Sequence, residues 1–488
     1  MRDYSPKRRT ALVFTGSGTT GAYHAGALKA LDESGVKIDV VVGSGIGTVA
    51  AAYAAVSGGA KLYGPSGFWQ GVRWDAFYRL RPVLRLALAL LGLSFAFFAL
   101  PLLAALVLGL LSPFILIAYR ISPATTARVL DPLWMAPEAL SGPYLATQAV
   151  PVFALALLAV LTSLVLYLRD RRRVAESFES LLDARPGLAR LRGGLWDIAR
   201  GVSLGSRPPS EAELGRRYVA LLAENLGEPG FRELVLRAAD LDRGAGLVFT
   251  VLRDEPPAEG GTRPRPRGAH LGDAVDLRAP GHDALLYDAV ATGLLCSMAM
   301  PLRRVSFPKG GVHGGETHRL TEGTFTPGAG IAEALAAGAE QVIVVTGVPD
   351  SPAAPARRRG PHARLDAAVR TLERQAMHEI DETERLNRVI GTLGHRHGDG
   401  RGAWEDPATG QVYREVDLWV IRPERRALGP LELDGARDPA TEVVQTTDDL
   451  LELGFRDAYR QFVEPVVGQS PLPVREEGKY SNTQPVGL

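Results

Sequence analysis

The chain has 488 residues, which is enough for two or three average domains or for one α/β fold with insertions. Its 55 basic and 54 acidic residues leave a formal net charge of +1, so no overall field favours nucleic acid as a partner. The single cysteine, Cys296, excludes an intrachain disulfide and a cysteine-rich zinc site, and we expect it to be a small buried residue. The first ten residues lack the apolar core of a signal peptide, which favours a cytoplasmic location for the N-terminal part.

The N-terminal segment predicts a βαβ unit. Residues 10–14 and 37–43 are strand-like, and residues 22–34 between them have a helical pattern. The loop after the first strand contains the spacing G-x-G-x-x-G, which is also found in dinucleotide-binding folds. Those folds need an acidic residue at the end of the second strand, whereas the nearest acid, Asp39, lies at its start. A nucleotide-binding oxidoreductase is therefore disfavoured, and no cofactor is expected.

The second strand ends in Gly43, Ser44, Gly45, Ile46 and Gly47. This is the layout of a nucleophile elbow, G-x-S-x-G, in which a tight strand-to-helix turn presents a central serine to the substrate. Here the central residue is a glycine, which has no nucleophilic atom.

Two long apolar segments follow. Residues 86–119 contain no formal charge over 34 positions, and residues 149–168 add another 20. A helix needs about 20 apolar residues to span a bilayer, so we expect both segments to be transmembrane. Arginines flank the pair on both outer sides, which places both flanks in the cytoplasm by the positive-inside rule. The first segment exceeds one span, so tilt or breaks at Pro101 and Pro113 must absorb the excess. The alternative is a peripheral hydrophobic insertion or a long buried helical hairpin.

The remaining elements are expected to return the chain to solvent. Residues 174–201 and 208–227 are helical in pattern, and Ser210 with Glu213 forms a capping-box pattern. Residues 233–252 predict two strands around a turn at 242–244. Residues 341–347 and 416–423 are strand-like and frame an amphipathic helix at 364–391, whose broad apolar face carries Leu365, Val369, Leu372, Met377, Ile380 and Leu386.

With these motifs in place, the sequence resembles the patatin-like phospholipases. Residues 15–31 align without gaps to the family's strand, G-G-G-x-R-G oxyanion loop and helix, and residues 41–59 align to its elbow. Residues 296–347 resemble the family's approach to a catalytic aspartate and the helix and strand beyond it. The resemblance implies an α/β fold, a three-layer patatin-like domain with a parallel-rich central sheet, here interrupted by a transmembrane helical hairpin.

The expected organisation has four parts. The first part of the patatin-like domain covers 10–60, and an insertion with the two transmembrane segments and solvent helices covers 61–225. The second part of the domain covers 226–465, and a mobile tail covers 466–488. Both parts of the domain must lie on one side of the membrane, so the resemblance and the flanking charges together imply a multi-pass membrane protein with a cytoplasmic domain.

The chain departs from the family at the chemistry that the resemblance implies. Family members use a serine and aspartate dyad, with backbone N–H groups of the glycine loop holding the oxyanion. Gly45 occupies the serine slot, and Glu322 occupies the aspartate slot, where one extra methylene displaces the carboxylate. Thr20 stands where arginine is common. The corresponding oxyanion loop is Gly16, Ser17, Gly18 and Gly21, and the elbow glycines are Gly43 and Gly47.

The main hypothesis is a pseudoenzyme, since losing the nucleophile of a serine hydrolase costs about six orders of magnitude in rate. Such a protein would bind lipid or acyl chains, or act through a membrane-protein partner, without nucleic acid. The alternative is an active lipid acyl hydrolase in which Ser17 or Ser44 is a relocated nucleophile and Glu322 the base. Ser297 and His24 resemble non-catalytic residues of the family. His395 and His397 lack further ligands, so no metal is expected.

Overall fold

The structure is a computed structural model. It describes residues 4–81, single helical positions between 85 and 123, and then 182–201, 207–255, 265–266, 271, 274–295, 302–310, 313–349, 361–396, 402–405, 412–425, 428–437 and 443–468. The chain divides into two compact units, one formed by Met1–Arg79 with Ala184–Leu488 and the other by Leu80–Asp183. Each unit is described by itself.

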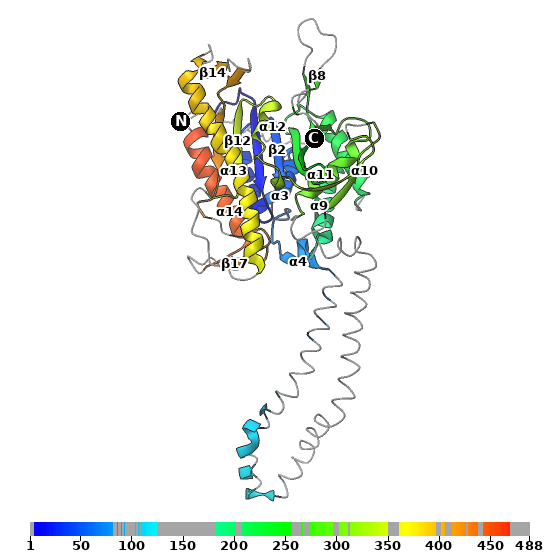
Figure 1. Cartoon of the computed structure of the whole chain (residues 1–488), viewed down its shortest axis with the longest axis vertical. Coiled ribbons are helices and arrows are strands. Elements are labelled where there is room, and N and C mark those ends of the chain that lie inside the picture. The colour runs from blue at the N-terminus through cyan, green and yellow to red at the C-terminus, as the bar shows by residue number, and fades with distance from the viewer. Residues whose placement is uncertain are drawn as a thin grey trace, which may run out of the picture. The chain divides into compact units, whose positions relative to one another are not determined.

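The first unit is built on a nine-stranded sheet in the order β10-β11-β5-β2-β1-β12-β16, to which β6 and β9 attach through β5 (Figure 1). Its strands are β1 (Thr10–Gly16), β2 (Val40–Gly45), β5 (Glu233–Asp240), β6 (Ala245–Val251), β9 (Val275–Asp276), β10 (Arg303–Ser306), β11 (Thr317–Glu322), β12 (Gln341–Thr346) and β16 (Asp417–Ile421). The central run β5-β2-β1-β12-β16 is parallel throughout, whereas β6, β10 and β11 pair antiparallel. The expected α/β fold with a mostly parallel central sheet is therefore confirmed.

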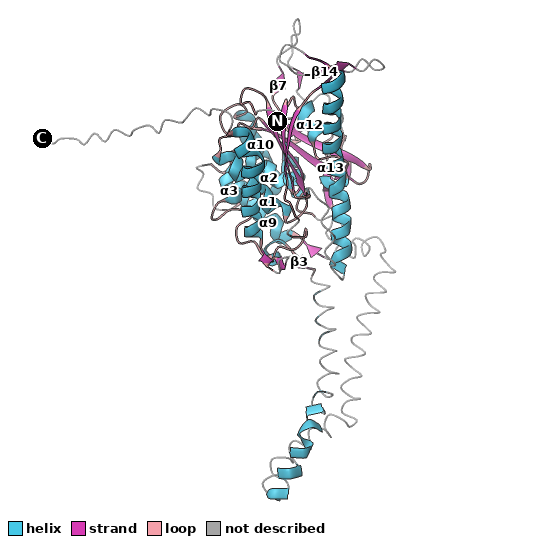
Figure 2. Ribbon diagram, turned by 90° about the vertical axis from the view of Figure 1, so that its left-hand side faces the viewer, coloured by secondary structure: helices cyan, strands magenta, loops and turns pink. Residues whose placement is uncertain are grey.

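Helices cover both faces of this sheet, as Figure 2 shows. The helices of the first unit are α1 (Thr20–Glu33), α2 (Gly47–Ala54), α3 (Gly59–Tyr63), α4 (Trp74–Phe77), α9 (Arg185–Ala199), α10 (Glu211–Glu224), α11 (Leu286–Thr292), α12 (Ile331–Ala336), α13 (Pro361–Leu393) and α14 (Thr447–Ala458). Two short 3₁₀ turns lie at η1 (Asp283–Leu285) and η2 (Gly323–Phe325), and a π-helix, η3 (Tyr459–Val467), follows α14. Helices α1 and α2 lie on one face of the sheet, and α12 and α13 lie on the other.

Small two- and three-stranded sheets complete the described elements. They are formed by β3 (Arg79–Leu80) with β4 (Leu182–Asp183), β7 (Asp254–Glu255) with β8 (Arg265–Pro266), β13 (His395–Arg396) with β14 (Gly402–Glu405) and β15 (Val412–Arg414), and β17 (Ala436–Arg437) with β18 (Val444–Gln445).

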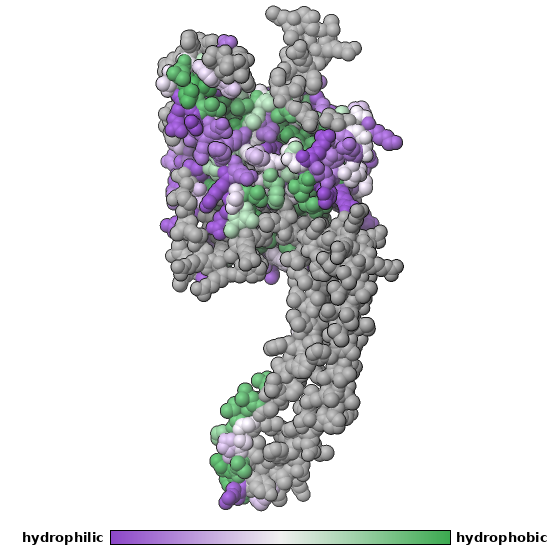
Figure 3. Space-filling view, viewed as in Figure 1, coloured by the Kyte–Doolittle hydropathy of each residue, from purple (hydrophilic) through white to green (hydrophobic). Residues whose placement is uncertain are grey.

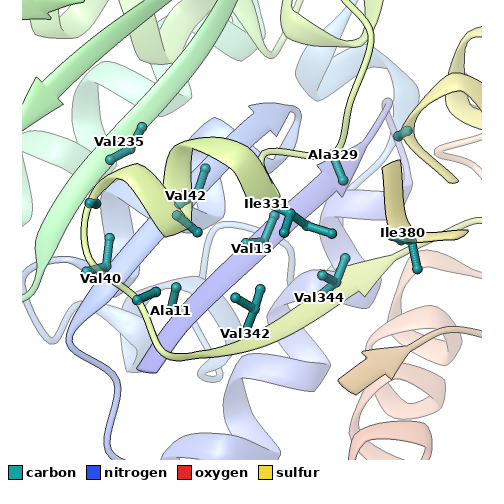
Figure 4. Close-up of a cluster of buried hydrophobic side chains, with 14 of the residues drawn as sticks. Ala11, Val13, Val40, Val42, Val235, Ala329, Ile331, Val342, Val344 and Ile380 are labelled. Carbon is teal, nitrogen blue, oxygen red and sulfur yellow. The ribbon is translucent and has the colours of Figure 1, made fainter. Parts of the chain in front are cut away.

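Alternating β-branched residues form the core beneath α12 and α13 (Figure 4). Side chains at every second position of β1, β2 and β12 point to this face, because successive strand residues point to opposite faces. They meet Ile331 of α12 and Ile380 of α13 in one buried cluster with Ala11, Val13, Val40, Val42, Val235, Ala329, Val342 and Val344. The central strands are buried on both faces, which explains their nearly continuous apolar sequence.

Several local expectations are confirmed. The strands β5 and β6 pair antiparallel on either side of residues 242–244. Ser210 caps α10 by accepting a hydrogen bond from the Glu213 N–H, but the Glu213 carboxylate pairs with Arg216 and Arg217 instead of completing the capping box. Residues 174–181 and 469–488 lie outside the described residues, so the start of that predicted helix and the rest of the mobile tail stay predictions. The expected start of the tail at residue 466 is wrong, because Val466 and Val467 are buried within η3.

The expected apolar face of α13 is partly wrong. Val369 and Ile380 are buried as predicted, but Leu386 is 40% exposed. The next residue, Asn387, exchanges two hydrogen bonds with the backbone of Val416. These bonds turn Asn387 toward the segment that precedes β16, so the Leu386 side chain is left exposed to solvent. The Leu365 side chain lies outside the described residues.

The described part of the second unit carries an exposed apolar helical surface. Its large apolar side chains are between 46% and 80% exposed, and Figure 3 shows them in green. They are Leu103, Leu106, Val107, Leu110, Leu111, Phe114, Leu116, Ile117 and Ile121. Within the described residues, no helix combines the length and apolar character required to cross a membrane. Pro101 and the whole segment 149–168 lie outside the described residues.

A single carboxylate on α13 holds the start of α12. Glu379 accepts hydrogen bonds from the backbone N–H groups of four successive residues, Ala329, Gly330, Ile331 and Ala332. These N–H groups have no partner within their own helix, so an anion in this position satisfies them.

We expect Glu379→Ala to lower the free energy of unfolding by about 2 kcal/mol, because several charge-assisted hydrogen bonds are lost together. Thermal melting of the detergent-purified chain checks this. Glu382→Ala, an exposed carboxylate on the same helix, is the matched control and should leave the melting temperature unchanged. Equal melting temperatures for the two variants would show that the Glu379 contacts contribute little.

Candidate active site

The predicted glycine loop and elbow lie side by side at the carboxyl ends of β1 and β2. Gly16 and Gly45 are paired in the parallel register, and the N–H of Ile46 donates to the Gly16 carbonyl at 2.9 Å. Gly45 has a φ of +59°, in the left-handed region that favours glycine. A Cβ built on Gly45 would lie 2.2 Å from the Gly16 oxygen and 2.9 Å from Thr324 Cγ2. The elbow conformation is present, but it has no room for a side chain.

Glu322 reaches the same place from the opposite direction. Strand β5 pairs with β2 up to Ser44, opposite Arg237, and its next residue, Ala238, pairs with Glu322 of β11. Because β6 occupies the other edge of β5, the ends of β2 and β11 meet along one edge. The structure therefore brings together three segments that are far apart in the sequence, the glycine loop, the elbow and Glu322.

Ser17 is the hydroxyl that contacts Glu322. Its Oγ donates to Glu322 Oε2 at 3.0 Å, and both residues are 2% exposed. The Ser17 N–H donates to a second carboxylate, Glu373 Oε1 on α13, at 3.3 Å. A buried serine thus lies between two buried carboxylates, one bound to its hydroxyl and one to its amide.

The next part of the glycine loop is held by the segment at 429–430. The Thr19 N–H donates to the Pro430 carbonyl at 3.1 Å, and the Thr19 hydroxyl donates to the Gly429 carbonyl at 2.9 Å. The contact is close, since a Cβ on Gly18 would lie 1.8 Å from the Pro430 oxygen. Loop N–H groups of the kind that hold an oxyanion in acyl transfer therefore already have acceptors inside the protein.

Ser44, the other candidate nucleophile, is fully buried. Its hydroxyl makes no hydrogen bond to any described residue, and it lies 2.8 Å from a Cβ built on Gly323. The side chain is therefore packed beside Gly323 rather than bonded to the Glu322 carboxylate.

His24 lies inside α1. It is completely buried, its Nε2 contacts the Thr15 carbonyl at 3.2 Å, and desolvation lowers its pKa to about 3. The imidazole is therefore neutral throughout the physiological range.

The other predicted glycines serve close packing. A Cβ on Gly21 would lie 2.0 Å from the Trp69 ring, and one on Gly47 would lie 2.2 Å from the Phe14 carbonyl. On Gly43 it would lie 2.6 Å from the Gly47 carbonyl, so these glycines let α1 and α2 approach their neighbours. Cys296, Ser297 and His397 lie outside the described residues, as does the His395 side chain. In the described part of the chain, no group of three or more metal-ligating side chains is found.

Glu373 is the site residue that the sequence analysis missed. Among the side chains of α13 that the structure describes, those at 369, 373, 376, 380 and 390 are buried, so Glu373 is a charged residue on the apolar face. A carboxylate at that position is costly to bury unless it finds donors. That mismatch between charge and helical position is the signal that could have identified it.

Comparison with known proteins bears on the same region. Residues 12–117 match the family model described as patatin-like phospholipase. The resemblance to this family is confirmed. The match includes the glycine loop and the elbow, and it extends into the first apolar segment.

Among solved structures, similarity is found to VipD from Legionella pneumophila, with 12% sequence identity and a TM-score of 0.30. The alignment covers 94% of this chain and 66% of that chain, just under two thirds of its length. A likeness of this size adds nothing to the fold described above. No curated protein sequence matches.

The patatin-like elbow predicts an unequal response to two glycine substitutions. Gly35 has a similar φ of +66°, but nothing lies within 4 Å of its would-be Cβ. We expect Gly35→Ala to cost about 1 kcal/mol of stability, for the left-handed backbone alone. We expect Gly45→Ala to cost about 2 kcal/mol more, because its Cβ also overlaps the Gly16 carbonyl. Thermal melting of both variants compares them, and equal losses would contradict the close contact.

Proposed function

We propose that this patatin-like chain is a membrane-anchored protein that binds lipid or acyl chains without the family's serine chemistry. The observation that carries the proposal is the elbow, where Gly45 stands in the serine slot and faces the Gly16 carbonyl at a distance that admits no side chain. A serine hydrolase needs a nucleophilic oxygen at this position. Binding of an acyl group requires only the surrounding scaffold.

The glycine loop supports the same proposal. Catalysis of acyl transfer requires N–H donors that are free to hold a developing oxyanion. The Ser17 N–H is bonded to the Glu373 carboxylate, so an oxyanion would compete with a negative charge for that donor. The Thr19 N–H is bonded to the Pro430 carbonyl. Both interactions stabilise the closed loop and oppose transition-state binding.

Membrane anchoring rests on the apolar segments. The described apolar side chains between Leu103 and Ile121 are exposed in a helical stretch, and a surface of that kind is unfavourable in water. The flanking arginines favour a cytoplasmic position for the patatin-like unit. An acyl chain would then reach the protein directly from the bilayer. The expected membrane-protein partner stays a prediction.

The Ser17–Glu322 contact favours a second candidate function, a divergent lipid acyl hydrolase. A hydroxyl 3.0 Å from a carboxylate has the spacing of a nucleophile and its base. In this proposal Glu322 removes the Ser17 proton as the oxygen attacks an ester carbonyl. It requires α13 to move, because Ser17 is buried and its N–H is held by Glu373.

Fluorophosphonate labelling of the detergent-purified chain distinguishes the two candidates. Our proposal predicts that no serine is labelled, either in the native chain or in Glu373→Met, where the competing carboxylate is removed. A commercial serine esterase in the same detergent controls for the probe. Peptide mass spectrometry that finds the label on Ser17, with loss of labelling in Glu322→Ala, would establish the hydrolase instead. Gly45→Ser is unsuitable as a positive control, because its Cβ overlaps the Gly16 carbonyl.

Removing residues 82–181, which contain both apolar segments, tests the anchor. Strands β3 and β4 flank this stretch and pair with each other, so its two ends are already adjacent. A variant with residues 82–181 replaced by a short Gly-Ser linker is expected to fold and to remain in the supernatant after alkaline carbonate extraction. The native chain is expected to remain with the membranes. Release of the native chain by carbonate would show that the apolar segments do not span the bilayer.

A further inference from the structure

A basic pocket lies away from the elbow, at the opposite end of α2. It has a volume of about 540 Å³ and is lined by residues of α2, α3, the segment 64–68 and α9. In Figure 2 these helices lie on the same face of the sheet. A pocket of this size suits a small ligand rather than a single ion.

The charges of the pocket are unbalanced. Lys61, Arg190 and Arg200 contribute three positive charges, and Asp197 contributes the one negative charge. Asp197 is already paired with Arg200 at 3.2 Å, and its backbone carbonyl accepts from the Lys61 ammonium. Arg190 donates to the carbonyls of Gly67 and Phe68, which fixes its position in the wall. The described lining residues therefore carry a net charge of +2, from three cations and one carboxylate that is already paired.

The Tyr53 hydroxyl supplies an independent observation. Tyr53 is completely buried and lines the pocket, and its hydroxyl makes no hydrogen bond to any described residue. A buried hydroxyl without a partner is costly, typically by the strength of a hydrogen bond. Burial also raises the pKa of Tyr53, so the group is a neutral donor.

The helix opposite is shaped around this hydroxyl. A Cβ on Gly194 of α9 would lie 1.8 Å from the Tyr53 oxygen, so only glycine admits the hydroxyl here. Glycine inside a helix is destabilising relative to alanine. Helix α9 therefore carries a helix-destabilising glycine beside the unpartnered Tyr53 hydroxyl, and both residues line the pocket.

We propose that this pocket binds a phosphate monoester group. Its donors come from three directions, α2, α3 and α9, which matches a tetrahedral anion with several acceptor oxygens. One phosphate oxygen would give the Tyr53 hydroxyl the acceptor that it lacks, and the others would bind the Lys61 ammonium and the guanidinium groups. The group can belong to a soluble metabolite or to the headgroup of a phospholipid. The proposal does not depend on the chemistry at Gly45.

The melting temperature of the full-length chain in detergent tests binding, since a ligand that binds only the folded state raises it. Glycerol 3-phosphate and dihexanoyl phosphatidic acid are the two probes, and glycerol and dihexanoyl phosphatidylcholine are their controls. Stabilisation by both phosphomonoesters indicates that the phosphate is sufficient. Stabilisation by the phosphatidic acid alone identifies a lipid headgroup.

Variants decide whether the probe is in this pocket. Tyr53→Phe should leave the unliganded melting temperature unchanged or slightly higher and weaken probe binding about tenfold, as expected for one hydrogen bond to a charged group. The matched control is Tyr218→Phe, because the Tyr218 hydroxyl is bonded to the Ala52 carbonyl. It should lower the melting temperature without changing the dissociation constant.

The charge is tested in the same way. A Lys61→Gln, Arg200→Gln double variant should abolish the shift, whereas Lys29→Gln, a lysine outside the pocket, should retain it. Failure of both phosphomonoesters to stabilise the native chain would overturn the proposal. An undiminished shift in the double variant would overturn it equally.

Discussion

The Gly16 carbonyl lies against Gly45 at the carboxyl ends of β1 and β2, and the chemistry available at this site depends on that contact. The parallel register pairs the two glycines, and the Ile46 N–H bonds the elbow to the loop. In a patatin-like site the same position holds the nucleophile. Here the backbone of the loop occupies the space that a side chain at position 45 would need, so this position carries no side-chain oxygen.

Two carboxylates of helix α13 bind backbone N–H groups, one in the glycine loop and one set at the start of α12. Glu373 accepts the Ser17 N–H, and Glu379 accepts the N–H groups at the start of α12. Both are placed by the apolar face of α13, which packs on the sheet through residues such as Ile380. The interactions are of one kind, a side-chain anion bound to backbone donors that would otherwise bind an anionic ligand or transition state.

Local patterns predicted the βαβ unit and the elbow, because alternating apolar residues and turn spacing are features of short stretches of sequence. The place of Glu322 was implied instead by the resemblance to the patatin-like phospholipases. The alternative with a relocated nucleophile paired Glu322 with either Ser17 or Ser44. Local patterns could not choose between the two serines, since the choice depends on β2 and β11 meeting along one edge of β5. Leu386 was assigned to the buried face because periodicity ignores the hydrogen bonds that Asn387 makes with Val416. Glu373 was overlooked because its donor comes from a loop more than 350 positions away.

Amide hydrogen exchange at the glycine loop tests the central claim most directly. The Ser17 N–H is bonded to Glu373, so peptides covering Gly16–Thr19 should be protected in the native chain. In Glu373→Met the exchange of these peptides should accelerate by about tenfold or more, while exchange in β12 stays unchanged. In the exposed-site control, Glu382→Met, exchange of the loop peptides should equal that of the native chain. Equal protection of the loop in the native chain and in Glu373→Met would contradict the account, because the carboxylate would then not be what closes the site.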